Sequence, residues 1–517
     1  MRPRERGDRA GLDPPQPQDL REEGPAEGRI RAGTRVFEGL SAAGARGGLD
    51  EPAGRGRDPR RLRRRPEDLH PLPRRPDRRE PRGPSGPGDT GGRRRRLSVL
   101  DPLLSRIETS WPYLVLLAFF AFYPVLSSIM WTTTSATYYW RRERRKQQMP
   151  QPEEGSYPSV SVLVPCYCEE ALIGETLRSC LALDYPNFEV VVVDDGSIDG
   201  SLREILPFVQ RGEVRLVAKA ENEGKAMAIN DAIPCLRGEI VFILDADSSP
   251  EPLLLRHVVP HFSSPRVAAV TGNPRVVEKA TFLQKLQAIE FTSIVSIQRR
   301  AQRVWGRVLT VSGVVSVFRR SALLDVGLFS PDMATEDIDI TWKLQKRYYD
   351  VRYEPEAIVW MRVPKDFRSL WKQRKRWTLG LAQVLRRHGS DVLTWKRRRM
   401  WPVFFESSLS ILWAYVFVGL TAFWAFSYAV GHPPVGASPI PNWWGMLIAT
   451  LCLMQLGTGV LLDRRYDRSI LRYLPVAVYY PLVYWILMAI VTSVSTPKGL
   501  FSTSNAGTPT RWNTKRR

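Results

Sequence analysis

The sequence predicts an α/β domain with a mostly parallel sheet, inserted between transmembrane helices. Short runs rich in Val and Ile alternate with helical stretches, as expected of strands that are buried on both faces of a parallel sheet. Long uncharged runs flank this region on both sides, and bilayer crossing requires about 20 such residues in a helix. Acidic residues follow three of the short apolar runs, at the sheet edge where open α/β sheets bind their ligands.

The first segment, residues 1–105, is rich in Arg, Pro and Gly and has no periodic apolar pattern. Such a segment cannot bury enough apolar surface to fold, so we predict a disordered extension. Its first 100 residues contain 25 Arg, no Lys and 16 Asp or Glu. Arg without Lys is also typical of GC-rich coding sequence that is read from too early a start. The segment is therefore either a disordered extension or absent from the protein in the cell.

The net charge of +22 lies mainly beside apolar runs, once the +9 of the first 100 residues is subtracted. Basic residues that flank apolar spans are typical of the cytoplasmic face of a membrane protein. We therefore expect the lipid bilayer, and not nucleic acid, as the partner of these charges. The five scattered Cys residues form neither a paired disulfide framework nor a zinc-binding pattern.

The region 106–140 is predicted to contain the first transmembrane span, because residues 111–139 carry no charge. The basic run RRERRK follows at 141–146, and positive residues favour the cytoplasmic side. We therefore expect residues 155–400 to form a cytoplasmic domain with amphipathic interface helices.

The region 401–497 is predicted to form three further transmembrane segments. Its apolar runs cover residues 403–430, 443–462 and 472–495. Residues 498–517 form a basic tail. The sequence thus describes a multi-pass membrane protein with one large domain between its first and second spans.

Acidic residues end three of the predicted strands. Glu169 follows the first strand, Asp195 stands in the Asp-Asp-Gly-Ser after the second, and Asp245 and Asp247 form the Asp-x-Asp after a later one. Any one cluster could be a turn or a helix cap. Three clusters at the ends of parallel strands converge on one edge of the sheet, which favours a ligand site.

The Asp245-x-Asp247 pair is typical of a site for Mg²⁺ or Mn²⁺. Mg²⁺ takes one or two carboxylates and completes its shell with water and substrate phosphates, as a nucleotide diphosphate would provide. Lys225 lies in a turn before a helix, where it either approaches such phosphates or is solvated. The sequence lacks the Gly-x-x-x-x-Gly-Lys-Ser/Thr loop, which excludes a P-loop ATPase.

Two further clusters lie later in the domain. Thr335-Glu336-Asp337-Ile338-Asp339 begins a helical run, where its acids are either helix caps or catalytic groups. Gln373, Arg376 and Trp377 lie in a basic amphipathic run that is typical of a helix in the membrane interface. Arg binds phosphate in a bidentate manner and Trp can stack on a sugar, so this run has the residues for a donor and acceptor site.

Taken in order, these motifs resemble the processive glycosyltransferases of family 2, which include cellulose, chitin and hyaluronan synthases. The stretches AAVTGNPRV, DMATEDIDITWKLQ, SLWKQRKRW and MWPVFFE resemble most closely the poly-β-1,6-N-acetyl-D-glucosamine synthases. This resemblance covers about residues 120–490 and not the first 100. It implies a nucleotide-diphospho-sugar transferase (GT-A-type) domain in the cell membrane of a bacterium.

The resemblance also implies a role for each motif residue. Asp337 becomes the general base. The residues that contact the donor or the acceptor sugar are Glu169, Asp195, Lys225, Asp245, Gln373, Arg376 and Trp377. The metal ligands are Asp247 and Asp245. Only the motif alignment selects Asp337 from the three acids of its cluster.

The function implied is that of a hexosyltransferase, an N-acetylglucosaminyltransferase that inverts the sugar anomer and adds sugars processively. Its donor is UDP-N-acetylglucosamine, its acceptor is the growing polysaccharide, and its product is the exported β-1,6-linked polymer of a biofilm matrix. A small membrane accessory subunit is an optional further partner. The alternatives are a synthase of another β-linked polysaccharide, of the cellulose, chitin or hyaluronan type, or a non-catalytic membrane export subunit.

Overall fold

The computed structural model describes residues 35–37, 91–144, 150–153, 155–434 and 443–501. The predictions of a disordered extension over 1–105 and of a basic tail over 498–517 fall largely outside these ranges. Within them, the structure places a short strand, β1 (Arg35–Phe37), and a helix, α1 (Gly91–Glu108).

The centre of the domain is a nine-stranded sheet, counted over the described residues, in the order β1-β4-β3-β2-β5-β8-β7-β9-β6. Its strand pairings make six strands run in one direction, while β1, β6 and β8 run in the other. The strands after β1 are β2 (Val160–Cys166), β3 (Phe188–Asp194), β4 (Arg215–Ala218), β5 (Ile240–Leu244), β6 (Ser248–Pro250), β7 (Val267–Val276), β8 (Val315–Arg319) and β9 (Asp350–Met361). The predicted α/β class with a mostly parallel sheet is confirmed.

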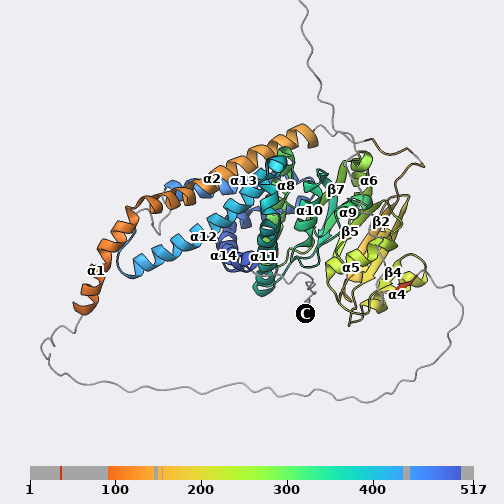
Figure 1. Ribbon diagram of the computed structural model, residues 1–517, viewed down its shortest axis with the longest axis horizontal. Helices are drawn as coiled ribbons and strands as arrows, with labels where there is room; N and C mark the ends of the chain where they lie inside the picture. The colour runs from red at the N-terminus through yellow and green to blue at the C-terminus, as the bar shows by residue number, and fades with distance from the viewer. Residues whose placement is uncertain (1–34, 38–90, 145–149, 154, 435–442, 502–517) are drawn as a thin grey trace, which may run out of the picture.

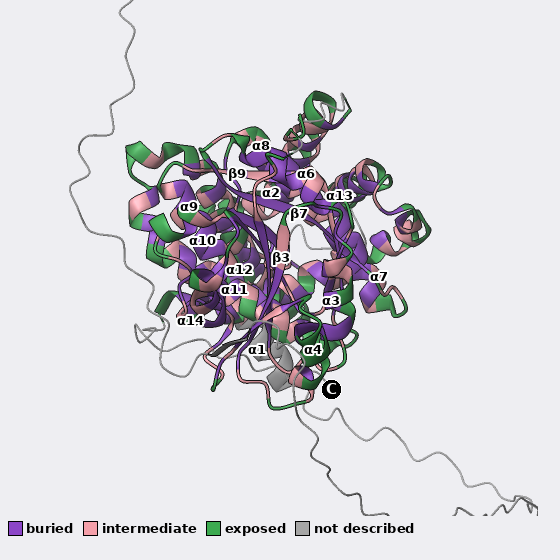
Figure 2. Cartoon of the chain, turned by 90° about the vertical axis from the view of Figure 1, so that its right-hand side faces the viewer, coloured by how far each residue is buried: buried purple, intermediate pink, exposed green. Residues whose placement is uncertain are grey.

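Helices cover both faces of the sheet, which explains why its strands read as continuous apolar runs (Figures 1 and 2). Every residue of β2 is buried. Its alternate side chains pack against helices on opposite faces. One face carries α3 (Ile173–Leu181), α4 (Ser201–Gln210) and α6 (Leu254–Val258). The other carries α5 (Lys225–Ala232), α9 (Arg320–Asp325) and α10 (Glu336–Lys346).

Four helices of the described chain are long and apolar enough to cross a membrane. They cover Trp111–Glu143, Trp395–Ala429, Trp443–Asp463 and Pro481–Phe501. Their main parts are α2 (Trp111–Tyr138), α12 (Trp401–Ala429), α13 (Trp443–Asp463) and α14 (Ile486–Phe501), which extend away from the sheet in Figure 1. Each of the four predicted apolar runs overlaps one of them.

The last span begins later than the apolar run 472–495 suggests. Residues 468–479 form a separate 3₁₀ helix, η6 (Arg468–Tyr479), which contains Pro475. Asp467 caps this helix by accepting a hydrogen bond from the Ser469 amide. Pro lacks the N–H that a continuous α-helix requires, so the spanning helix starts only at Pro481.

Four helical segments lie between the sheet and the spans. Three form one continuous stretch, α7 (Phe282–Ile289), η4 (Glu290–Val295) and α8 (Ser296–Trp305), and the fourth is the interface helix α11 (Phe367–Val392). α11 and α14 touch at their backbones, since a Cβ added at Gly499 would lie 2.6 Å from Leu379 O. A Cβ added at Gly459 of α13 would lie 2.5 Å from Ser293 Cα of η4. Small residues at such crossings allow close helix packing.

A group of charges, the junction cluster, joins the domain to these spans; all of its members are buried except Arg465 at its edge. It consists of Glu143, Arg275, Arg300, Asp463 and Arg465. Arg300 forms ion pairs of 2.7 Å with Asp463 and 2.5 Å with Glu143. Arg275 also pairs with Asp463, and Arg465 lies 2.6 Å from Glu143. Arg275, Arg300 and Asp463 are almost completely inaccessible to solvent.

The junction cluster predicts that Asp463→Asn destabilises the whole protein. The substitution removes the anion between Arg275 and Arg300, and one unpaired buried charge costs about 3–5 kcal/mol. Thermal unfolding of the detergent-purified chain should therefore begin at a clearly lower temperature. The exposed neighbour Arg464 is the control, and Arg464→Gln should unfold like the wild type. Equal stability of the two variants would contradict this role for Asp463.

Candidate active site

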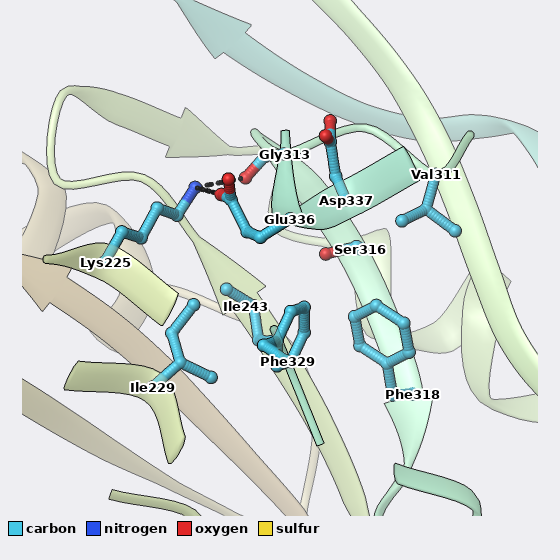
Figure 3. A pocket seen from close by; sticks show the side chains of 10 residues that line it. All are labelled: Lys225, Ile229, Ile243, Val311, Gly313, Ser316, Phe318, Phe329, Glu336 and Asp337. Atoms are coloured by element: carbon cyan, nitrogen blue, oxygen red, sulfur yellow. Dashed lines mark hydrogen bonds and ion pairs between the residues drawn. The ribbon is translucent and has the colours of Figure 1, made fainter. Parts of the chain in front are cut away.

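A cleft lies beyond the carboxyl end of β5, where the polar groups of Lys225, Gly313, Glu336 and Asp337 lie above an apolar floor (Figure 3). Asp245 pairs with Lys225 beside this cleft. The Lys225 ammonium donates to Asp245 Oδ1 at 2.6 Å and to the Gly313 carbonyl at 3.2 Å. It lies 3.4 Å from Glu336 Oε1. Lys225 is thus a member of a buried ion group and is not solvated.

The loop before α5 delivers Lys225 into this cleft, and Asp195 holds the loop. The Asp195 carboxylate is fully buried and accepts hydrogen bonds from the amides of Glu223, at 3.2 Å, and Gly224, at 2.7 Å. Gly224 has φ of 94°, a conformation that favours glycine. Lys219 lies 3.2 Å from the same carboxylate. Asp195 therefore positions the loop, while its contact with the donor stays a prediction.

The charges in the cleft shift one another's protonation equilibria. Burial lowers the pKa of Lys225, but Asp245, Glu336 and Asp337 raise it by more, so its pKa lies above the usual value. Burial raises the pKa of Asp245; Lys225 opposes this shift and Asp247 adds to it. The cleft therefore keeps one cation among several carboxylates, an arrangement typical of functional sites.

The three acids at the start of α10 have different surroundings, which the sequence could not distinguish. Asp339 is fully buried, accepts a hydrogen bond from Ser330 Oγ at 2.6 Å and lies 2.8 Å from His388 Nε2. Glu336 is buried against Lys225. Asp337 alone is partly exposed, and Figure 3 shows its carboxylate pointing away from the Lys225–Glu336 pair.

Asp337 also has the protonation behaviour of a general base. Burial and the neighbouring Glu336 raise its pKa to about 6, against the opposing effects of Lys225 and Arg376. By contrast, His388, Lys343 and Ser330 outweigh the effect of burial on Asp339 and lower its pKa. A carboxylate that titrates near neutral pH is well matched to accepting a proton in a reaction.

The helix α11 places Arg376 near Asp337. Arg376 Nη1 donates to the Ala334 carbonyl at 3.2 Å, and its charge acts on Asp337. Trp377 packs under the Arg374 guanidinium, whose carbon lies 4.0 Å from the ring centroid. The Gln373 side-chain oxygen is buried and accepts no hydrogen bond within the described chain. Within the described residues, neither Gln373 nor Trp377 forms a hydrogen bond or ring contact with Asp337.

Arg374 is a structural residue of this helix that the sequence reasoning missed. It is buried, lies 2.6 Å from Glu290 Oε2 and donates to the Tyr484 hydroxyl at 2.8 Å. Glu290 belongs to η4, and Tyr484 to η7 (Pro481–Trp485) at the start of the last span. Helical periodicity could have revealed that Arg374 is buried, because it follows the buried Leu370 by four residues and so lies on the same face of α11. Gly313 was also missed, and no motif marked it.

Two predicted residues, Glu169 and Asp247, do not line the cleft in the described chain. The Glu169 amide donates to Ser201 Oγ at 2.8 Å, in the loop region that follows β2. Asp247 Oδ1 accepts from Ser248 Oγ at 3.2 Å, two residues after Asp245. The described chain contains no cluster of three or more His, Cys, Asp or Glu side chains that could bind a metal ion. Two carboxylates nevertheless fit a Mg²⁺-type ion that takes its other ligands from phosphates and water.

Comparison with known proteins identifies the family. Residues 158–380 match the family model described as "Glycosyltransferase like family 2". A poly-β-1,6-N-acetyl-D-glucosamine synthase of Staphylococcus epidermidis is 32% identical over 387 residues, which cover 74% of this chain and 94% of the relative. One of Staphylococcus aureus (strain COL) is 33% identical over 408 residues, 77% of this chain and 99% of the relative. The chain belongs to the poly-β-1,6-N-acetyl-D-glucosamine synthases of glycosyltransferase family 2.

Membership of this family makes the chain a sugar-transferring enzyme with a GT-A-type domain, as expected from the resemblance. The alternative of a non-catalytic export subunit is therefore not retained. Among solved structures, the chain is similar to the mannosyltransferase PcManGT from Pyrobaculum calidifontis, solved in complex with GDP-Man and Mn²⁺. The match covers 70% of this chain and 98% of the PcManGT chain. The two chains are 26% identical and superpose with a TM-score of 0.48. This similarity is too low to assign a ligand to the present chain.

The packing of α11 against the start of α10 predicts that Gly380→Ala impairs catalysis. A Cβ at Gly380 would lie 2.1 Å from Thr335 Oγ1, so Thr335 and the following Glu336 and Asp337 must shift. A displacement of about 1 Å in a catalytic group can cost about 100-fold in rate. Sugar transfer by the purified variant should fall by about 10- to 100-fold.

The matched control for this prediction is Gly457→Ala in α13, where a Cβ meets open space. Both variants should show the thermal stability of the wild type within a few degrees. Full activity of Gly380→Ala would contradict the prediction, because it would show that the Thr335 side chain can rotate away without displacing Glu336 and Asp337.

Proposed function

We propose that this enzyme polymerises N-acetylglucosamine from UDP-N-acetylglucosamine into a β-1,6-linked polysaccharide and exports the polymer across the cell membrane of a bacterium. The name of its relatives supports the sugar and the linkage. The four apolar helices support a membrane location with the domain on the cytoplasmic side. The observation that carries the proposal is the partly exposed Asp337, held in a charged cleft with its pKa near 6. The small accessory subunit stays a prediction.

The proposed reaction is a single inverting displacement. The 6-hydroxyl of the terminal sugar attacks C1 of the donor sugar, a new C1–O bond forms, and the bond from C1 to the diphosphate breaks. Asp337 accepts the proton of the attacking hydroxyl, while UDP leaves with the bonding electron pair. An α-linked donor thus gives a β-glycoside. A positioned base contributes about 10²- to 10⁴-fold to the rate.

The leaving diphosphate would be held by cations at the other side of the cleft. Asp247 and Asp245 are the residues that would hold a divalent ion, Mg²⁺ or Mn²⁺. When bound, such an ion neutralises charge on the departing diphosphate. Lys225 already binds one oxygen of Asp245, at 2.6 Å, and adds a fixed positive charge there. Arg376 adds another from the side of α11.

The acceptor would approach along α11, which lies between the cleft and the spans. Arg376 faces the Asp337 end of the cleft, whereas Trp377 and Gln373 lie on the same helix nearer to η4 and α14. An aromatic ring binds the apolar face of a sugar, and the unbonded Gln373 oxygen is an acceptor for a sugar hydroxyl. Each added sugar would thereby pass from the base toward the membrane helices.

The proposal predicts that Asp337→Asn abolishes polymer synthesis and leaves donor binding nearly intact. Membranes that contain the wild type should convert labelled UDP-N-acetylglucosamine into a polymer, which a β-1,6-specific hydrolase degrades completely. Asn has nearly the same shape but accepts no proton at neutral pH, so the variant should make no detectable polymer. Titration with the labelled donor should give an affinity within about threefold of the wild type, since binding requires no proton transfer.

Asp247→Ala provides the contrasting variant, because it should weaken donor binding that depends on Mg²⁺ or Mn²⁺. Substantial polymer from Asp337→Asn would disprove the base assignment. A wild-type product that resists the β-1,6-specific hydrolase but yields to a cellulase, chitinase or hyaluronidase would instead support a synthase of another polymer.

The pKa of Asp337 predicts the pH dependence of the reaction. The carboxyl is protonated and inactive as a base below about pH 6, and it ionises as the pH rises. Where sugar transfer limits the rate, activity should increase between pH 5 and 7 with a midpoint near 6. Because Arg376 lowers this pKa, the residual activity of Arg376→Gln should have its midpoint at higher pH. An unchanged midpoint in that variant would assign the titration to another group.

A further inference from the structure

A second, strongly basic pocket lies about the short helix η5 (Trp395–Met400), which leads into α12. We call it the η5 pocket. Its lining carries no acidic residue. The polar groups that line it are Arg307, Gln345, Tyr348, Lys396, Arg397 and Arg399. The run WKRRRM, which the sequence analysis treated only as charge beside a span, thus contributes three cations to one cavity.

The deepest cation of the η5 pocket, Arg307, forms no ion pair within the described residues, although Asp350 acts on its charge. Arg307 is only 8% exposed, and its Nε is buried without a hydrogen-bond acceptor in the described chain. Its Nη1 donates to the adjacent Gly306 carbonyl, at 3.3 Å. Burial lowers the pKa of Arg307, a sign that its charge is poorly compensated. A buried guanidinium without an anion is costly, so this site is prepared for one.

The two acids near the η5 pocket, Asp350 and Asp391, each pair with a cation outside it, and Asp391 also lies near Arg397 of the pocket. Asp350 pairs with Arg303, at 2.8 Å, and with Arg352, at 2.9 Å. Asp391 pairs with Lys346 and is only 3.6 Å from Arg397, whose Nε also lacks an acceptor in the described residues.

The pocket's other two cations are exposed. Lys396 and Arg399 form no ion pair with an acid of the described residues. The positive charge of the pocket is therefore open to a ligand.

The location of the pocket identifies its ligand. η5 forms the first residues of the apolar span Trp395–Ala429, so the pocket lies where the chain enters the bilayer, on the side of the domain. Trp395 is 69% exposed beside it, in the position of an interfacial anchor. An anionic lipid places its phosphate at this depth, and a row of cations there attracts it.

We propose that the η5 pocket binds the phosphate-bearing headgroup of an anionic lipid, with Arg307 at its base and Lys396 and Arg399 at its rim. Arg side chains bind phosphate oxygens through paired N–H groups, and charge-assisted hydrogen bonds are the stronger ones. This site is separate from the cleft of Asp337. The two are connected by α10, whose first turn carries Asp337 and whose last turn includes Gln345 of the pocket.

The test measures lipid binding to the full chain, purified in a neutral detergent and freed of lipid. Phosphatidylglycerol and phosphatidylcholine are added in turn, and the lipid retained is counted by native mass spectrometry. The wild type should retain phosphatidylglycerol in clear preference. Arg399→Gln should bind it at least about tenfold more weakly than the matched variant Arg398→Gln, because one charge-assisted contact is lost. Arg398 is the neighbour on η5 that stacks on Trp395 and does not line the pocket.

The two variants remove the same charge from the same exposed helix, so a general attraction to anionic surfaces would affect them alike. Equal losses would therefore overturn the proposal. So would equal retention of phosphatidylcholine by the wild type. Lys396→Gln is the second pocket variant and should repeat the loss. If inorganic phosphate or UDP alone displaces the lipid at equal concentration, the pocket is a site for a free anion and the lipid assignment fails.

Discussion

The pairing of Glu143 and Asp463 with three arginines is the constraint on which the arrangement of this enzyme depends. Each carboxylate is contributed by a segment at the end of a span, whereas Arg275 and Arg300 belong to the sheet domain and its helix α8. Charges at this depth cannot separate without a large desolvation cost. The domain is therefore fixed against the spans at one edge, and the helices between them must pack into the space that remains.

The active cleft is a product of that fixed arrangement. The sheet supplies Asp245 and the loop of Lys225, while α11, held against α14 at Gly499 and against η4 through Arg374, supplies Arg376. Asp337 lies between the two parts: burial and Glu336 raise its pKa, and Lys225 and Arg376, one cation from each part, lower it. Because Asp337 is the proposed base, this dependence on the sheet and on the interface helix would couple the proposed chemistry to the position of the membrane helices.

Local patterns in the sequence predicted the strands, the acids at their ends and the four apolar runs, because periodicity and hydrophobicity act over short stretches. They could not predict that β8 would lie antiparallel between β5 and β7, since that depends on contacts between distant segments. For the same reason, the sequence left Glu336, Asp337 and Asp339 equivalent. The contacts of Asp339 with Ser330 and with His388, 49 positions further along the chain, show that its carboxylate is already paired. Arg374 was overlooked because its partners Glu290 and Tyr484 lie far from it in the sequence.

The order in which the junction cluster is synthesised has a consequence for biogenesis. Arg275 and Arg300 leave the ribosome well before Asp463, their common partner, which stands at the end of the third span. A nascent chain whose third span has not yet been inserted carries two core arginines without their shared anion. The domain can therefore reach its final packing only after that insertion. The packing of the domain thus depends on the insertion of a later helix, whose Asp463 follows Arg300 in the chain by more than 150 residues.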